Sequence, residues 1–265
     1  MPLRDGSIRF AVIGDSGRGD AAQHEVARQM VAWRAKFPFE FVLMLGDNIY
    51  DSHTPEDYVR KFEEPYRALL DSGVQFFAAI GNHDDPGQIY YDRFNMDGRR
   101  YYTFRKSERR PAGLLGAGVR FFVLDSRSFD PEQLAWLREE LAASGTHWKI
   151  ASFHHPIYTS ARYQGLARAL RLVLEPILIA GDVDVVLSGH EHVYERTHPQ
   201  HGISYFVSGA AGSLRAGDVR PSAITARSFD RDLHFMLMEI SGQELYFQAI
   251  SRTGESVDAG VIRQR

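Results

Sequence analysis

The sequence predicts an α/β protein, and three observations carry this prediction. Short apolar runs of strand length end at or just before Gly, Asp or His, and helical patterns alternate with them, as layered α/β architectures require. Beyond residue 203 the pattern changes to strand-like runs alone. With 265 residues, 44% of them hydrophobic, the chain can bury one large core, and we predict one domain over residues 1–265.

The first group of predicted strands reads as buried, because each run is almost wholly apolar. These strands are residues 8–14, 39–46, 75–81, 119–125, 148–154 and 183–188. The helices predicted between them are residues 21–37, 54–70, 130–143 and 164–180. Thr54 and Asp130 each precede a proline and an acidic first turn, which is typical of a helix start. Pro65 and Pro176 lie inside predicted helices, so each helix is expected to kink or break before its proline.

The later strand-like runs predict a second sheet. They are residues 203–208, 235–240, 244–251 and 257–263. Residues 209–231, rich in Gly, Ala, Ser and Arg, predict a long loop of the kind that contacts substrate near a functional site. The Arg-rich residues 105–111 predict a solvated turn without a function.

Composition and charge exclude several classes of binding partner. A net charge of −3 provides no basic face for a phosphate backbone, so we expect no nucleic-acid partner. No window approaches the ~20 apolar residues of a membrane span, so no membrane partner is expected either. With no cysteine, any metal must be bound through oxygen and nitrogen. The N-terminal residues carry no signal-peptide pattern, which indicates either a cytoplasmic protein or an extracytoplasmic (periplasmic or secreted) one whose leader has been removed. The oligomeric state is left open.

Polar side chains follow the ends of five predicted strands, where they are expected to gather at one edge of a sheet. The five segments are Gly14-Asp15-Ser16-Gly17, Gly46-Asp47-Asn48-Ile49-Tyr50, Gly81-Asn82-His83-Asp84, Phe153-His154-His155-Pro156 and Gly189-His190-Glu191-His192. Their carboxylates, amide, phenol and imidazoles are sufficient to hold two metal ions.

Individual roles follow from spacing. His190 and His192 are two residues apart in an extended or turning segment, so each can reach a different ion of a close pair. Asp47 has two carboxylate oxygens and is predicted to bridge both ions, and Asn82 offers a neutral oxygen. His154 is expected to bind metal, whereas its neighbour His155 should point elsewhere, because side chains alternate along extended backbone.

The five ordered segments resemble the calcineurin-like metallophosphoesterases, specifically the purple acid phosphatase (tartrate-resistant acid phosphatase-like) branch. Most other members of that superfamily carry a histidine ligand where this chain has Gly17, and in purple acid phosphatases a tyrosinate at the place of Tyr50 binds Fe(III). The resemblance implies a four-layer αββα sandwich of two mixed β-sheets flanked by helices. It implies a binuclear centre of Fe(III) plus a divalent metal (Fe, Zn or Mn).

The resemblance also implies the ligand set and the chemistry. Fe(III) would be bound by Asp15, Asp47, Tyr50 and His192, and the divalent metal by Asp47, Asn82, His154 and His190. A metal-activated hydroxide would attack a small phosphorylated substrate, a phosphate monoester, while His83 contacts the phosphate and protonates the leaving oxygen.

Other readings remain open from the sequence. Where many family members have a second substrate-facing histidine, this chain has Tyr163, so Tyr163 or Arg162 is expected to bind phosphate, unless both are surface residues of a helix start. A phosphodiesterase or nucleotide pyrophosphohydrolase on the same scaffold is one alternative function. A catalytically silent metal- or phosphate-binding protein is another.

Overall fold

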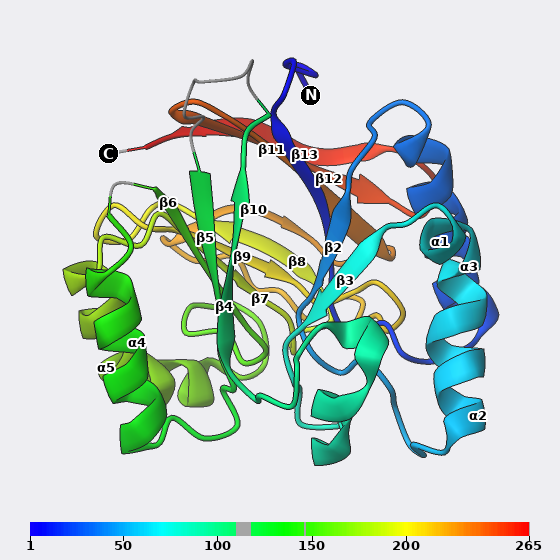
Figure 1. Ribbon diagram of the computed structural model, residues 1–265, viewed down its shortest axis with the longest axis horizontal. Helices are drawn as coiled ribbons and strands as arrows, with labels where there is room; N and C mark the ends of the chain where they lie inside the picture. Colours follow the sequence, from blue (N-terminus) through cyan, green and yellow to red (C-terminus); the bar gives the residue numbers. More distant parts are fainter. Residues whose placement is uncertain (110–117, 146, 265) are drawn as a thin grey trace.

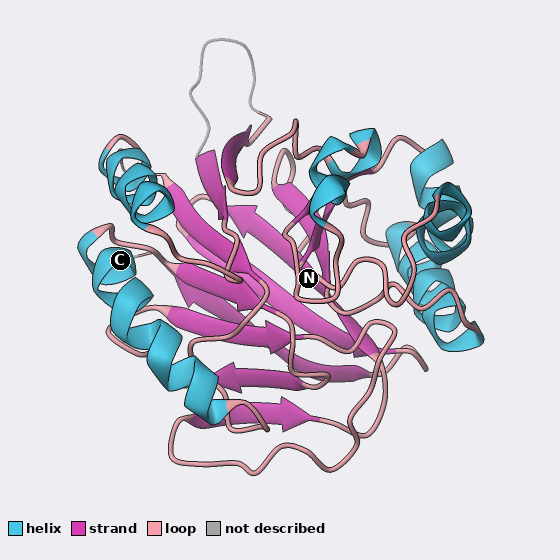
Figure 2. Ribbon diagram, turned by 90° about the horizontal axis from the view of Figure 1, so that it is seen from below, coloured by secondary structure: helices cyan, strands magenta, loops and turns pink. Residues whose placement is uncertain are grey.

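The computed structural model describes residues 1–109, 118–145 and 147–264. Two β-sheets lie face to face, with α4 (Pro131–Ala142) and α5 (Gln164–Ala180) on one flank. The other flank holds α1 (Ala21–Arg34), α2 (Pro55–Tyr58) and α3 (Glu64–Asp71) (Figure 1). Seen from below, the strands fill the middle of the molecule and the helices stand outside them (Figure 2). The four-layer αββα sandwich is therefore confirmed.

One sheet combines the start and the end of the chain. In spatial order its strands are β13 (Ser256–Arg263), β12 (Glu244–Ser251), β11 (His234–Ser241), β1 (Ile8–Ile13), β2 (Phe41–Met44) and β3 (Gln75–Ala78). The β1, β2 and β3 strands are parallel, and β11 pairs antiparallel with β1, so the sheet is mixed.

The middle of the chain forms the other sheet. In spatial order its strands are β10 (Thr225–Phe229), β8 (Tyr194–Thr197), β9 (Ser204–Ser208), β7 (Val185–Ser188), β6 (Trp148–Phe153), β5 (Gly118–Val123) and β4 (Tyr102–Ser107). The prediction that the late strands make a sheet of their own is wrong. β9 instead joins β7, and β11 to β13 extend the sheet that begins with β1.

Strand alternation divides the core between the layers. Phe121 of β5 faces the first sheet, where its ring packs edge-on to Phe10 with centroids 5.4 Å apart. Its neighbour Phe122 points the other way, into the cluster with Leu137 of α4 and Leu174 of α5. Both faces of this sheet are thus buried, as the uninterrupted apolar sequences of its central strands indicate.

Other boundary predictions had mixed outcomes. Thr54 and Asp130 cap their helices as expected, and a π-helical turn, Val59–Glu63, interrupts the second helix just before Pro65. α5 instead continues through Pro176 without a break. Short 3₁₀ helices at Pro86–Tyr90 and Asp92–Phe94 follow β3.

Three strands were missed. β4 includes part of the segment 105–111 that was predicted as a turn, and residues 110–111 lie outside the described residues. The predicted loop 209–231 contains β10, and β8 follows the last histidine motif directly. Within the described residues, no helix is long and apolar enough to cross a membrane.

Candidate metal centre

The turns after β1, β2, β3, β6 and β7 bring their polar side chains together. Three residues that begin these turns, Asp15, Asp47 and His190, have positive φ angles of 56°, 51° and 66°. Non-glycine residues seldom adopt this left-handed region, and such backbone strain concentrates at functional sites. A Cβ at Gly81 would lie 2.2 Å from Oδ1 of Asp47, so glycine there lets two turns approach each other.

One group of donors is formed by Asp15, Tyr50 and His192. The Tyr50 hydroxyl lies 3.3 Å from Oδ1 of Asp15 and 3.1 Å from Nε2 of His192. The same histidine nitrogen is 3.3 Å from Oδ1 of Asp15. All three side chains are buried, and they come from three different turns.

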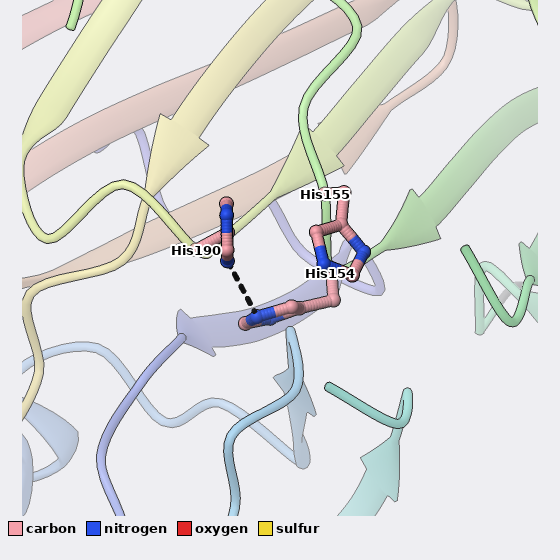
Figure 3. Close-up of side chains that lie close together, drawn as sticks. All are labelled: His154, His155 and His190. Carbon is pink, nitrogen blue, oxygen red and sulfur yellow. Dashed lines mark hydrogen bonds between the residues drawn. The ribbon is translucent and has the colours of Figure 1, made fainter. Parts of the chain in front are cut away.

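A second group is formed by Asn82, His154 and His190. Nε2 of His154 lies 3.0 Å from Oδ1 of Asn82. The same nitrogen lies 3.2 Å from Nδ1 of His190 (Figure 3). Nδ1 of His154 lies 2.9 Å from the Leu45 carbonyl oxygen and therefore donates its hydrogen there. This fixes Nε2 as the nitrogen that carries a lone pair.

Asp47 lies between the two groups. Its Oδ1 is 3.4 Å from Nε2 of His154, and it accepts a hydrogen bond of 2.9 Å from the backbone N–H of His83. Asp15, Asp47 and His154 bring their ligand atoms within 4.8 Å of one another. A carboxylate in this position has one neighbour group on each side, which is the arrangement expected of a bridge.

Burial sets the protonation of the imidazoles. Desolvation lowers the pKa of His190 to about 2, helped by the neighbouring His154 and His155, and lowers the pKa of His192 to about 3. Desolvation also holds the pKa of His154 well below its usual range. All three are therefore neutral near pH 7 and present lone pairs, as metal ligands must.

Burial raises the pKa of the Tyr50 phenol, whereas it lowers the pKa of the histidines. Desolvation, and then the charges of Asp15 and Asp47, raise the pKa of Tyr50 far above its ordinary value. Its ionisation therefore requires a strong local positive charge, which a bound metal ion supplies.

The donor set fits metal ions. Around Nε2 of His154 stand an amide oxygen, a carboxylate oxygen and a second imidazole nitrogen at 3.0, 3.4 and 3.2 Å. The amide and carboxylate oxygens are acceptors, as is Nε2 itself, so a cation placed among these atoms would turn their mutual repulsion into coordination.

His155 departs from its prediction. Instead of pointing away, its ring packs on His190 with centroids 4.4 Å apart (Figure 3), and its Nδ1 lies 3.0 Å from Oγ of Ser126. The residue lies beyond the end of β6, where the chain turns toward Pro156, so strand alternation no longer applies. Its ligand atom is close enough to those of His154 and His190 to form a possible metal-binding group with them.

The residues predicted to meet substrate lie around this cluster. His83 is exposed, and its ring centroid is 4.9 Å from that of Tyr50. The Tyr163 ring packs on His190 at 4.4 Å. The Arg162 guanidinium instead donates to Asp218 at an exposed position, so it is already paired.

Sequence reasoning missed two buried acids that hold the turns. Asp84 accepts hydrogen bonds from the backbone N–H groups of Asn48, Ile49 and Gly81, at 2.7, 3.0 and 2.8 Å. Glu191 accepts one of 2.6 Å from the Tyr163 N–H. Both lie inside the quoted motifs, but only their hydrogen bonds distinguish them from ligands.

Comparisons with known proteins agree with this architecture. Residues 8–194 match the family model described as calcineurin-like phosphoesterase. Tartrate-resistant acid phosphatase type 5 of Rattus norvegicus is 26% identical over 95% of this chain and 89% of its own length. Purple acid phosphatase 17 of Arabidopsis thaliana is 28% identical over 84% of this chain and 74% of its own length.

Solved structures show the same fold. The purple acid phosphatase PPD1 from yellow lupin seeds superposes with a TM-score of 0.75 at 17% identity, over 99% of this chain and 55% of that one. GAP50, described as the anchor in the inner membrane complex of Plasmodium, gives a TM-score of 0.84 at 18% identity, over 98% of this chain and 89% of that one. Because one of these two structures is described as an anchor, the fold alone does not establish catalysis.

Proposed function

The chain belongs to the calcineurin-like phosphoesterase family, and on that premise we propose that it hydrolyses phosphate monoesters as a purple acid phosphatase-like enzyme with two metal ions. The acid phosphatases at 26% and 28% identity support the monoester preference, because each aligns with more than four fifths of this chain. The observation that carries the proposal is the pair of donor groups on either side of Asp47.

We assign the two groups to different ions. The group with the phenol, made of Asp15, Tyr50 and His192, is proposed to hold Fe(III) together with Asp47. A hard trivalent ion suits this group, since it can ionise a phenol whose pKa is raised by burial. The group of Asn82, His154 and His190 has only neutral donors besides Asp47, which suits a divalent Fe, Zn or Mn.

Two cations, when bound, would neutralise phosphoryl oxygens and lower the pKa of water enough to provide a nucleophile near neutral pH. The protein residues then orient the reaction. His83 is exposed beside the Tyr50 ring, from where it can reach the leaving oxygen of a bound ester and donate a proton to it. Tyr163 lines the opposite group through its contact with His190, whereas Arg162 would have to leave Asp218 before it could bind phosphate.

The test is reconstitution of the metal-free protein. Protein stripped with a chelator should release no phosphate from 4-nitrophenyl phosphate, and it should gain activity as iron and zinc are added up to about two ions per chain. Bis(4-nitrophenyl) phosphate serves as the diester comparison, and faster hydrolysis of it would favour the phosphodiesterase alternative. Two bound ions with no hydrolysis of either ester would identify a catalytically silent metal-binding protein.

A further inference from the structure

The arginines around the metal centre differ in what holds them. Arg127 forms a two-pronged ion pair with Asp125 at 3.0 and 2.9 Å. Arg162 is paired with Asp218, and Arg215 donates to the His190 carbonyl at 3.2 Å with Glu191 3.8 Å away. Each of these guanidinium groups already lies within ion-pairing distance of a carboxylate in the protein.

Arg18 is different. Its Nε donates to the Ser213 hydroxyl at 2.8 Å, and its guanidinium carbon lies 3.9 Å from the centroid of the Tyr50 ring. Among the described parts of the chain, no carboxylate lies within ion-pairing distance of it. The side chain is half-buried, so its charge is held in place without an anionic partner.

The terminal nitrogens of the Arg18 guanidinium remain available for an anion. Ser213 occupies only Nε, so the two terminal nitrogens can bind a carboxylate or phosphate with two parallel hydrogen bonds. The contact with the Tyr50 ring and the hydrogen bond that Arg18 donates to Ser213 fix the guanidinium in place, which lowers the entropy lost when an anion binds. Ser213 belongs to the segment 209–224 between β9 and β10, within the loop expected to contact substrate.

The position favours the leaving group over the reacting phosphoryl group. Two bound metal ions would neutralise the phosphoryl oxygens, whereas the Arg18 guanidinium lies over the ring of Tyr50, 3.9 Å from its centroid. His83, the proposed proton donor to the leaving oxygen, also packs on that ring. The guanidinium and the proton donor therefore border the same side chain.

We infer that Arg18 is a specificity-determining residue that binds a second anionic group on the leaving group of the substrate. The favoured substrates are phosphate monoesters whose leaving group carries a carboxylate or a further phosphate. This inference rests on the proposed phosphatase activity.

The test compares two substrates that differ in one charge, phenyl phosphate and 4-carboxyphenyl phosphate. Arg18→Gln should lower kcat/KM for the carboxylated ester by about 10- to 100-fold, the range of a lost charged hydrogen bond, and change phenyl phosphate by less than about threefold. Arg60→Gln is the matched control, because Arg60 also approaches Gly19 but is exposed and paired with Asp57. The control should leave the substrate ratio unchanged.

Binding provides a second measurement that does not depend on turnover. Titration calorimetry with 4-carboxyphenylphosphonate and phenylphosphonate should show a preference for the carboxylated ligand in wild type and in Arg60→Gln, and none in Arg18→Gln. An equal loss for both ligands would place Arg18 at the phosphoryl group, and no loss for either would remove its role. Wild-type protein that hydrolyses neither ester would instead defeat the proposed function itself.

Discussion

Nε2 of His154 faces Oδ1 of Asn82 at 3.0 Å, while Nδ1 of the same ring donates its hydrogen to the Leu45 carbonyl. Neither of the two facing atoms carries a hydrogen, so their contact is unfavourable until a cation lies between them. Burial keeps the pKa of His154 low, and protonation therefore does not relieve the contact near pH 7. The turns after β3 and β6 are thus arranged for a metal ion.

Asp47→Ala should abolish metal pairing and activity together. Asp47 adjoins both donor groups, so its loss removes the proposed bridge. We expect at most about one ion per chain by elemental analysis and a fall in kcat/KM of more than about 100-fold. Asp71→Ala, at an exposed helix end, is the control. Wild-type turnover in Asp47→Ala would overturn the site assignment.

Tyr50→Phe should remove a visible absorption band from iron-loaded protein. A tyrosinate bound to Fe(III) absorbs visible light by charge transfer, and the buried phenol has little other reason to ionise. Tyr66→Phe, a second buried tyrosine, should keep the band. Aerobically purified wild type that contains iron but stays colourless would separate Tyr50 from the iron.

His83→Ala should leave the metal content intact and slow poor leaving groups most. The side chain is exposed beside Tyr50, so its removal opens no cavity. A general acid contributes more as the leaving group becomes more basic, and we expect about 10²-fold loss for alkyl phosphates and little loss for 4-nitrophenyl phosphate. Equal slowing across a series of esters would rule out the acid role, and His198→Ala provides an exposed-histidine control.

Much of the fold could be predicted because the strands that position the site are apolar and stop at a polar residue. β8 was missed because its sequence, Tyr-Glu-Arg-Thr, carries two charges. In the fold Glu195 accepts from the Ser160 N–H at 2.7 Å and Arg196 pairs with Asp258, so partners distant in sequence make those charges compatible with a strand. Such partners cannot be read from a local pattern.

The assignment of the strands to the two sheets could not be predicted for the same reason. Ile8 pairs with Ile240 across most of the chain, and no local signal indicates that β11 returns to β1. Spacing did predict which motifs meet, but not the orientation of His155, since the chain leaves strand geometry at that residue. Two statements stay predictions. One is that residues 1–265 form one catalytic domain, and the other is that the seven residues named as metal ligands bind metal.

Replacing His234 should make the protein less sensitive to acid. His234 is fully buried, and desolvation lowers the pKa of its imidazole to about 3. Between that value and the unfolded pKa of about 6.5, only the unfolded state binds the proton, so stability falls as pH drops through this window. One proton corresponds to about 1.4 kcal/mol per pH unit.

The measurement is urea unfolding of metal-free protein at pH 7 and pH 4.5. The stability of wild type relative to His234→Gln should fall by about 2.5 kcal/mol between pH 7 and pH 4.5. His198→Gln, at an exposed site, should follow wild type. A constant difference between wild type and His234→Gln would show that His234 titrates alike in both states.

Asp84→Ala should cost both stability and metal affinity, because this buried carboxylate ties the turn that leads to Tyr50 to the turn that holds Asn82. Its loss leaves the backbone N–H groups of Asn48, Ile49 and Gly81 without their acceptor, at about 1–3 kcal/mol each. We expect destabilisation of at least about 3 kcal/mol in urea unfolding and metal binding about 10- to 100-fold weaker.

The adjacent exposed acid separates this effect from a general loss of charge. The side chain of Asp85 accepts from the Gly87 N–H at the start of a 3₁₀ helix, so Asp85→Ala should cost about 1 kcal/mol and spare metal binding. Asp84→Asn keeps one oxygen acceptor and should fall between the two alanine variants. If Asp84→Ala unfolded and bound metal like Asp85→Ala, the two turns would have to be held by the metal ions themselves, and the carboxylate would be dispensable once the site is loaded.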